Sequence, residues 1–294
     1  MPFVFSPNEL HRLNRLAFRM RCNPTESSSG ERRIRRSGDG FDFLDYRAYS
    51  RGDDIRKIDW NLYGRFRQLF VRIHEAPRQT SISFVIDASR SMMFGEPRDK
   101  ITQAQLISAG LTFVALRGGD RVYLTTFGES SLPIRGPFSG IRRHSLIIDE
   151  LQQITCGGQS LMLQAVRQLA SRRLHRGLVV LISDFLGTGD IEAVLRIICG
   201  SGGRALAIQL LAPEDRGANL KPGVVRLQDS ETGEMVQVLI DESSIAAFQE
   251  QFRTRQEAMK RLFSQRGQTL VETMVHEDYP SAISRVLSTG VIRS

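Results

Sequence analysis

The chain has 294 residues, of which 41% are hydrophobic and 24% are charged, a balance typical of soluble globular proteins. Its apolar runs are far too short to cross a membrane, and its N-terminus lacks the apolar core of a signal peptide, so we expect a cytoplasmic protein with no membrane span. The three cysteines, Cys22, Cys156 and Cys199, lie far apart and form no CxxC pair, which argues against a disulfide framework and a zinc site.

The net charge of +8 is concentrated near the N-terminus. Residues 1–80 hold 16 Lys and Arg against 10 Asp and Glu, a net charge of +6, and the whole chain has only four Lys. Arginine pairs with carboxylates and phosphates through a planar fork of donors. The charge therefore admits an acidic protein partner or a nucleic acid, beside the simpler interpretation of an Arg-rich surface that only aids solubility.

Two segments precede any sign of a sheet. Residues 6–20 place Leu10, Leu13 and Leu16 on one side of a predicted amphipathic helix. Residues 25–40 are polar and glycine-rich, which is typical of a linker, and they carry a basic stretch at 32–36. We therefore treat residues 1–40 as an N-terminal helix and basic linker.

From about residue 80 the pattern alternates between apolar strands and helices. The predicted strands are 81–87, 121–127, 177–185 and 204–213, and the predicted helices are 100–120, 145–154, 160–174 and 190–200. Continuous apolar strands separated by helices indicate a parallel sheet that is covered on both faces. The sequence thus predicts an α/β fold with a doubly wound, mostly parallel, Rossmann-like sheet.

The pattern changes after residue 213. Residues 224–240 predict a hairpin with its turn near 231–233, and a long helix follows from Asp241 to Gly267. A last strand over 269–275 and a short helix end the chain. We assign the apolar stripe of the long helix to the core, and its members are Ile245, Phe248, Phe252, Met259 and Phe263.

Polar side chains follow two of the predicted strands. Asp87 ends the strand 81–87, Ser89 and Ser91 follow it, and Asp184 ends the strand 177–185. Because ligands of open α/β sheets bind beyond the carboxyl ends of the strands, we expect these side chains to converge. One direct carboxylate, two hydroxyls, a carboxylate that holds bound water, and waters make an all-oxygen octahedron, which is what Mg²⁺ prefers.

Two other interpretations of Asp87-x-Ser89-x-Ser91 stay open. The residues would only cap a loop, or a serine would act as a nucleophile. The nucleophile is the weakest interpretation, because no histidine lies in a motif that places it beside these serines. The chain also lacks a GxSxG elbow, a Walker A loop and a GxGxxG after the first strand.

The pattern Asp87-x-Ser89-x-Ser91 after a buried strand resembles the metal-ion-dependent adhesion site of von Willebrand factor A domains. The stretch 41–72 is more specific and resembles the signature of domain-of-unknown-function family 58. The matching residues are Arg47, Tyr49, Gly52, Asp53, Asp54, Arg56, Ile58, Asp59 and Trp60. The ETGE at 231–234 is also similar to a late hairpin of that family, so the resemblance covers roughly residues 30 to 280.

The resemblance implies a von Willebrand A-like domain over 81–294 with a hairpin insertion and C-terminal helix, and a signature segment over 41–80 packed on it. It implies a metal-dependent, non-enzymatic adaptor or chaperone-like assembly factor that works with a MoxR-type AAA+ ATPase. The metal would be Mg²⁺ or Mn²⁺ at Asp87, Ser89, Ser91 and Asp184, and a partner's acidic side chain would complete its coordination.

One departure from the adhesion-site pattern concerns the second loop. Gln159 stands where a threonine is expected, so Gln159 or Ser160 would replace it, or the site would bind no metal. In the signature, charges of alternating sign predict a buried ion-pair network that ties this segment to the sheet, with direct contact to a partner as the alternative. Ile58 and Trp60 predict a half-buried strand with Trp60 in the core.

Two further functions remain as alternatives to the adaptor. The Arg-rich N-terminal region would bind nucleic acid with a strong dependence on salt, although no aromatic-interleaved motif accompanies it. The carboxylate and serine residues would otherwise position a phosphoester for metal-dependent hydrolysis.

Overall fold

The computed structural model describes residues 43–74, 80–128, 133–187, 190–218, 220–228 and 235–292. The predicted helix 6–20, the linker 25–40 with its basic stretch, and the turn at 231–233 lie outside these ranges. The chain divides into two compact units, a smaller one of residues 25–79 and a larger one that contains residues 80–294. The expectation that the signature segment packs on the larger unit stays a prediction.

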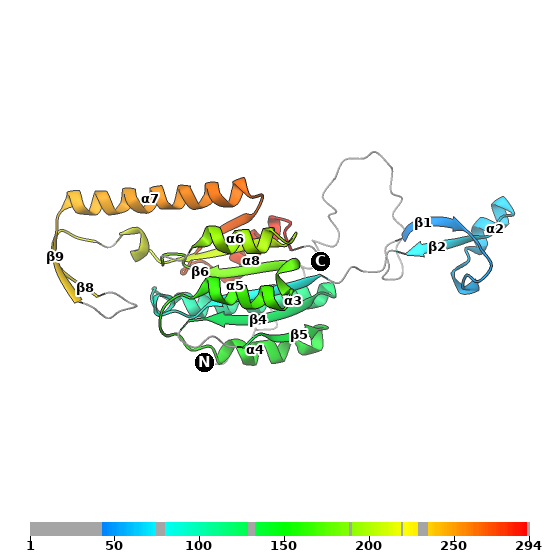
Figure 1. Ribbon diagram of the computed structural model, residues 1–294, viewed down its shortest axis with the longest axis horizontal. Coiled ribbons are helices and arrows are strands. Elements are labelled where there is room, and N and C mark those ends of the chain that lie inside the picture. The colour runs from blue at the N-terminus through cyan, green and yellow to red at the C-terminus, as the bar shows by residue number, and fades with distance from the viewer. Residues whose placement is uncertain are drawn as a thin grey trace. The chain divides into compact units, whose positions relative to one another are not determined.

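The larger unit is built on a six-stranded sheet (Figure 1). Its strands are β3 (Ser81–Asp87), β4 (Arg121–Phe127), β5 (Arg135–Ser139), β6 (Leu178–Ser183), β7 (Arg204–Leu211) and β10 (Thr269–Met274). They lie in the order β10-β7-β6-β3-β4-β5, and every pair is parallel except β4 with β5. The predicted α/β fold with a mostly parallel sheet is confirmed.

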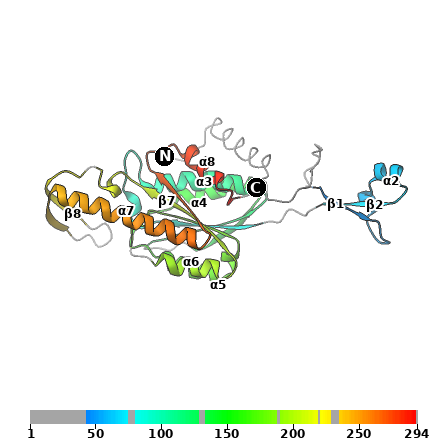
Figure 2. The same ribbon diagram turned by 90° about the horizontal axis from the view of Figure 1, so that it is seen from above.

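Helices cover both faces of this sheet (Figures 1 and 2). On one face lie α3 (Lys100–Gly118), α4 (His144–Gln152) and α8 (Tyr279–Ser288), and their apolar residues form one core with alternate residues of β3. On the other lie α5 (Met162–Ser171), α6 (Ile191–Cys199) and the C-terminal part of α7 (Glu242–Gln265). All six residues of β6 are buried, which explains its continuous apolar sequence.

The order in which strands are added to the sheet reverses between β3 and β6, which are neighbours. From β3 the chain proceeds outward to β4 and β5, then returns to β6 and continues through β7 to β10. In doubly wound sheets, this switch point opens a crevice at the carboxyl ends of the two strands. Asp87 ends β3, and Asp184 follows β6, so the fold places both beside the crevice.

The hairpin and the long helix also form as predicted. β8 (Gly223–Gln228) pairs antiparallel with β9 (Met235–Ile240), and Asp241 caps α7 by accepting the Ser244 N–H at 2.7 Å. The predicted apolar stripe belongs to the core only toward its C-terminal end, because Phe263 is buried whereas Phe248 is exposed. No helix among the described residues is long and apolar enough to cross a membrane.

The smaller unit contains the signature. β1 (Phe43–Ala48) pairs antiparallel with β2 (Phe70–His74), and a short 3-10 helix η1 (Ile55–Lys57) and α2 (Trp60–Phe66) lie between them. Ile58 and Val71 bridge the two halves and are buried.

The signature carboxylates act mainly as helix caps. Asp54 caps η1, and Asp59 caps α2 by accepting the N–H groups of Asn61 and Leu62 at 2.9 and 3.3 Å. The Tyr46 hydroxyl donates to the other oxygen of Asp59 at 2.9 Å. The Arg47–Asp53 pair at 2.7 Å is largely exposed within this unit, and the buried ion-pair network between the signature and the sheet stays a prediction.

The prediction of a half-buried strand through Trp60 was wrong. With Asp59 as its cap, the chain turns into α2 at Trp60, and the indole lies 59% exposed in edge contact with Tyr63. Alternation of charged and apolar residues was misleading here, because it also fits a capped helix start.

Because Trp60 is the only tryptophan, its fluorescence reports on this unit directly. We expect emission typical of a solvent-exposed indole and efficient quenching by iodide. Protection from iodide would instead indicate that α2 docks through its aromatic face. Trp60→Phe supplies the spectral background.

Candidate functional site

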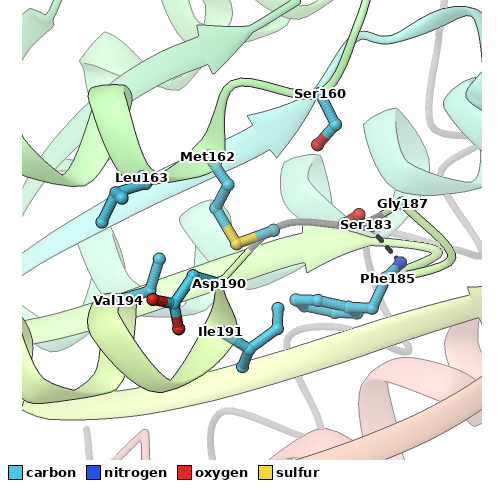
Figure 3. A pocket seen from close by; sticks show the side chains of 9 residues that line it. All are labelled: Ser160, Met162, Leu163, Ser183, Phe185, Gly187, Asp190, Ile191 and Val194. Atoms are coloured by element: carbon cyan, nitrogen blue, oxygen red, sulfur yellow. Dashed lines mark hydrogen bonds between the residues drawn. The ribbon is translucent and has the colours of Figure 1, made fainter. Parts of the chain in front are cut away.

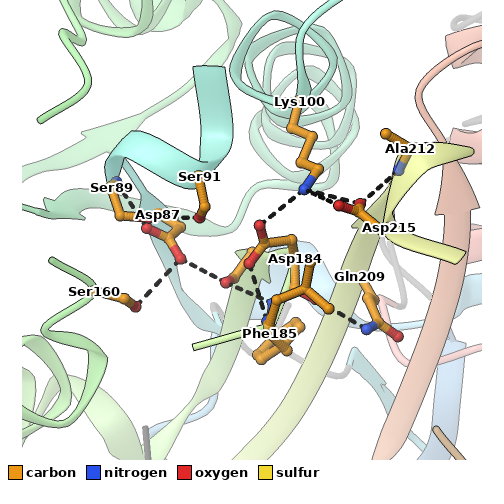
Figure 4. Close-up of polar contacts among 12 residues, drawn as sticks. Asp87, Ser89, Ser91, Lys100, Ser160, Asp184, Phe185, Gln209, Ala212 and Asp215 are labelled. Carbon is orange, nitrogen blue, oxygen red and sulfur yellow. Dashed lines mark hydrogen bonds and ion pairs between the residues drawn. The ribbon is translucent and has the colours of Figure 1, made fainter. Parts of the chain in front are cut away.

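The end of β3 carries the predicted site residues into one loop. The Asp87 side chain is 1% exposed, and its Oδ1 accepts the backbone N–H of Ser89 at 2.9 Å (Figure 4). The loop then forms a short 3-10 helix, η2 (Arg90–Met93), which brings the Ser91 hydroxyl within 3.1 Å of the Ser89 hydroxyl. The three residues are therefore brought together as predicted.

Two further hydroxyls meet the other oxygen of Asp87. Ser183, the last residue of β6, donates to Oδ2 at 2.5 Å, and Ser160 donates to the same atom at 3.3 Å. We call Asp87, Ser89, Ser91, Ser160 and Ser183 the strand-end cluster. Sequence reasoning missed Ser183, although its place at the end of an apolar strand beside Asp184 was a usable signal.

Gln159 and Ser160 have different places. The Gln159 side chain is exposed, whereas Ser160 is the residue of this loop that reaches Asp87. The loop is held against the first one by the backbone, since Gly157 N–H donates to Ala88 O at 2.8 Å and Arg90 N–H donates to Gly158 O at 3.2 Å. Of the two candidates to replace the expected threonine, Ser160 is thus the one that contacts Asp87.

A tight contact of backbones fixes this arrangement. A Cβ on Gly128, just after β4, would lie 2.7 Å from Ala88 O and 3.1 Å from Gly157 O. Only glycine leaves room for three loops to approach this closely. The cluster is thus assembled from the ends of β3 and β6 and the loop before α5, and the end of β4 packs against these loops.

The environment of Asp87 disfavours its charge. Burial raises its pKa to about 6, although hydrogen bonds from Ser183 and Ser89 lower it, and the charge of nearby Asp184 raises it further. A carboxylate buried without a cation in this way is disposed to bind a proton or a metal ion.

Asp184 lies beside the cluster and, unlike Asp87, forms an ion pair with a buried lysine. Its Oδ1 accepts the Leu186 N–H at 3.1 Å, and its Oδ2 accepts from the Lys100 ammonium at 3.0 Å. The same ammonium lies 2.8 Å from Asp215 Oδ2 (Figure 4). Lys100 is only 1% exposed, so a buried cation stands between two carboxylates at the switch point.

Sequence reasoning missed Lys100 and Asp215. Lys100 opens α3 directly after its cap Asp99, a position where a lysine is ordinarily exposed. Asp215 lies in η5 (Glu214–Arg216), far along the chain. Only the folded sheet brings these two residues to the end of β6, so no local pattern identifies the pair.

The loop after β6 is held in a strained conformation. Phe185 has a left-handed φ of 54°, its N–H donates to Ser183 Oγ at 3.0 Å, and its side chain is buried. From α7, Arg255 donates to Gly187 O at 2.7 Å and to Phe185 O at 3.3 Å. Non-glycine residues with positive φ persist only where surrounding contacts hold them.

The spacing of two hydroxyls in the strand-end cluster fits neighbouring ligands of a magnesium ion, although it is also that of a hydrogen bond. Two ligands at neighbouring corners of a Mg²⁺ octahedron lie about 3 Å apart, because each Mg–O bond is about 2.1 Å. The Ser89 and Ser91 oxygens are 3.1 Å apart. Within the described ranges, no three His, Cys, Asp or Glu side chains group to hold a metal, so such a site would rely on hydroxyls and water.

The contacts of His144, His175 and Cys156 give little support to a nucleophilic mechanism. His144 and His175 bond to Ala109 O and to Ser201 Oγ, both at 2.8 Å, and neither hydrogen-bonds to a serine of the cluster. Burial raises the pKa of Cys156 to about 12, so its thiol stays protonated at neutral pH. A nucleophilic serine stays the weakest interpretation of the pattern at Asp87, Ser89 and Ser91.

Lys100→Met should destabilise the protein strongly, because it leaves Asp184 and Asp215 buried without a cation. We expect a loss of about 3–5 kcal/mol in the free energy of unfolding, measured by denaturant titration. Lys260→Met is the matched control, since Lys260 pairs with Glu272 at 2.8 Å on the surface and should lose less than about 1 kcal/mol. Equal small losses for the two variants would contradict this assignment.

Comparison with known proteins identifies relatives of uncharacterised function. The family model "Protein of unknown function DUF58" matches residues 45–259. The uncharacterised protein Rv1480 of Mycobacterium tuberculosis is 32% identical over 212 residues, which cover 69% of this chain and 65% of that protein. A Mycobacterium bovis protein, Mb1516, matches to the same extent. The chain thus spans about 65% of the length of these curated relatives.

Two solved structures resemble the larger part of the chain. BatB from Bacteroides thetaiotaomicron has a TM-score of 0.41 and 13% identity, over 71% of this chain and 97% of that chain. The VWA domain of SpRpn10 has a TM-score of 0.42 and 12% identity, over 74% of this chain and 98% of that chain. The family model covers most of the chain, including the signature, and the protein therefore belongs to the DUF58 family.

Proposed function

We propose that this protein is a non-enzymatic, metal-ion-dependent adaptor that binds an acidic side chain of a partner protein. The observation that carries the proposal is the pair of hydroxyls 3.1 Å apart beside one buried carboxylate. Asp87, Ser89 and Ser91 would hold Mg²⁺ or Mn²⁺, with Ser160 in the place of the expected threonine. Water held near Asp184 would supply a further ligand to the metal ion.

The charges around the cluster favour an acidic partner. Lys100 is paired with Asp184 and Asp215, so Asp87 is the carboxylate left to face a bound cation. A divalent ion bound beside Asp87 would keep an excess positive charge, because one carboxylate neutralises only half of it. In a site with little water, this charge would bind a further carboxylate favourably. The bound metal supplies this attraction, and the protein's residues supply its position.

The partner class follows from the family resemblance. An adaptor of this kind would work with a MoxR-type AAA+ ATPase. Its strand-end cluster would bind an acidic side chain of that ATPase or of the protein on which the ATPase acts. Membership of the family and the hydroxyl-rich site support a role in protein interaction.

Calorimetric titration with Mg²⁺ and Mn²⁺ tests the site residue by residue. We expect binding by the wild type, none by Asp87→Ala, and affinity about tenfold weaker for Ser160→Ala, which loses one oxygen at the site. Gln159→Ala is the matched control and should bind as the wild type does, because that side chain is exposed. Loss of binding in Gln159→Ala, with Ser160→Ala unaffected, would reverse the assignment of this loop.

The same titrations made with an acidic peptide, and with a candidate ATPase, test the adaptor. Metal and acidic ligand should each strengthen the binding of the other, since the coupling is reciprocal. Equal binding of the partner by wild type and folded Asp87→Ala would refute the proposal.

Metal affinity should also depend on pH. Asp87 has a pKa raised to about 6, so protons compete with the metal as the pH falls through that value. We expect affinity to fall about tenfold between about pH 7.5 and about pH 5, the range in which most Asp87 becomes protonated. An affinity that is the same at both values would mean that Asp87 does not contact the ion.

A further inference from the structure

The two ends of the sheet in the larger unit differ in chemistry. At the carboxyl ends of the strands lie the strand-end cluster and packed apolar side chains such as Met162 and Phe185 (Figures 3 and 4). At the amino ends, α5 and α6 end, α4 begins after β5, and β3, β4, β6 and β7 begin. We call the connections there, residues 80–81, 118–121, 139–143, 171–178 and 199–204, the amino-end face.

The amino-end face carries seven arginines, one acidic residue and no lysine. The acidic residue, Asp120, is buried, and its Oδ1 accepts the Thr80 N–H at 3.1 Å. Six of the arginines are exposed and form no ion pair within the part of the chain that the structure describes: Arg142, Arg143, Arg172, Arg173, Arg176 and Arg204.

Elsewhere on the larger unit, exposed arginines have carboxylate partners. On α7, Arg253 pairs with Glu250 at 2.5 Å, and Arg261 pairs with Glu257 at 3.7 Å. Like charges without partners repel one another and oppose the compact state. A face that keeps six such arginines is therefore suited to a ligand of opposite charge.

The arginines are spread across several strands. The starts of β7, β6, β3 and β4 lie side by side, and Ser139 at the end of β5 pairs with Arg121. Because neighbouring strands are about 4.8 Å apart, the face spans about 20 Å from Arg204 to Arg142. Each strand of a nucleic-acid duplex presents a phosphate every 3.4 Å or so, which is about six phosphates over this span.

Arg173 keeps its charge at a cost to the backbone. Its φ of 58° lies in the left-handed region, where glycine is unstrained, and Gly202 occupies such a position on the same face. The Arg173 side chain is exposed and makes no hydrogen bond among the described residues, so contacts within the protein do not explain an arginine here. Strain of this kind is typical of residues that contact a ligand.

The lack of apolar groups on this face selects among anionic ligands. Ile141, at 41% exposure, is the one large hydrophobic side chain that lies exposed there among the described residues. Protein interfaces are built around apolar and aromatic anchors, single-stranded nucleic acid stacks on aromatic rings, and membrane surfaces take up apolar side chains. The phosphate backbone of a duplex requires only positive charge and hydrogen-bond donors.

We propose that the amino-end face binds the phosphate backbone of double-stranded nucleic acid without regard to sequence. Guanidinium groups donate pairs of hydrogen bonds to phosphate oxygens, and binding releases the counterions of the duplex. This surface lies at the other end of the strands from the strand-end cluster, and it is separate from the basic stretch at 32–36. The inference does not rest on the proposed metal site.

Fluorescence anisotropy of a labelled DNA duplex of about 20 base pairs, titrated with the full chain, tests the proposal. With six phosphate contacts, the logarithm of the affinity should fall against the logarithm of the salt concentration with a slope of about −5. The affinity should thus fall about a thousandfold between about 50 and about 200 mM salt. A duplex RNA should show a similar slope. No binding of either duplex at about 50 mM salt would overturn the proposal.

Two double variants remove the same charge from different places. Arg172→Gln with Arg173→Gln should make the salt slope shallower by about 2, one for each lost phosphate contact. Arg253→Gln with Arg261→Gln is the matched control, because it removes two exposed arginines of α7 and should leave the slope as in the wild type. An equal effect of the two double variants would mean that net charge alone matters and would overturn the assignment to this face.

Arg173→Gly separates a lost contact from a damaged fold. Glycine adopts a left-handed φ without strain, so the midpoint of thermal unfolding should not fall. Duplex binding should weaken nonetheless, with a slope shallower by about 1. Wild-type affinity and slope in Arg173→Gly would show that this arginine does not contact the duplex and would count against the proposal.

Three further titrations decide between ligands and locations. Polyglutamate, or vesicles of anionic phospholipid, binding more tightly than the duplex would overturn the assignment to nucleic acid. Replacing Arg32, Arg33, Arg35 and Arg36 by Gln should leave most of the salt slope, and its complete loss would place the duplex on the basic stretch instead. Asp87→Ala, without divalent metal, should bind the duplex as the wild type does. Loss of duplex binding in folded Asp87→Ala would overturn the inference, whereas loss of metal binding alone concerns only the proposed function.

Discussion

The buried ammonium of Lys100 is the interaction on which the geometry at the switch point depends. It lies between Asp184, beyond β6, and Asp215, in the segment after β7, and it belongs to the first turn of α3. One side chain therefore ties a helix to two segments beyond neighbouring strands. Because two buried carboxylates close together would repel each other, the ammonium between Asp184 and Asp215 offsets that repulsion.

The pairing divides the carboxylates at the switch point into two kinds. Asp184 and Asp215 pair with the Lys100 ammonium, whereas Asp87 accepts only from hydroxyls and one N–H. Burial raises the pKa of both Asp87 and Asp215. In the proposed function, Asp87 is the carboxylate that would bind an external cation, whereas Asp184 and Asp215 hold Lys100. The strained Phe185 and the Gly128 contact belong to the same arrangement, since both hold loops close around Asp87.

Much of the fold was predictable, because buried strands have continuous apolar sequences. The limits of β3 and β4 match the predicted ones, and Asp87, Ser89 and Ser91 lie together as their spacing indicated. The edge strand β5, with Gly136 and Pro137, was not predicted, since a short antiparallel edge needs no apolar run. The role of Lys100 was not predictable either, because its burial results from contacts between residues 84 and 115 positions apart.

Anomalous diffraction from crystals grown with Mn²⁺ would test the central claim most directly. The account predicts a single strong peak beside the hydroxyls of Ser89 and Ser91 and the carboxylate of Asp87, with Lys100 still paired to Asp184 and Asp215. A well-ordered cluster with no manganese, or a peak between Asp184 and Asp215 with Lys100 displaced, would contradict it.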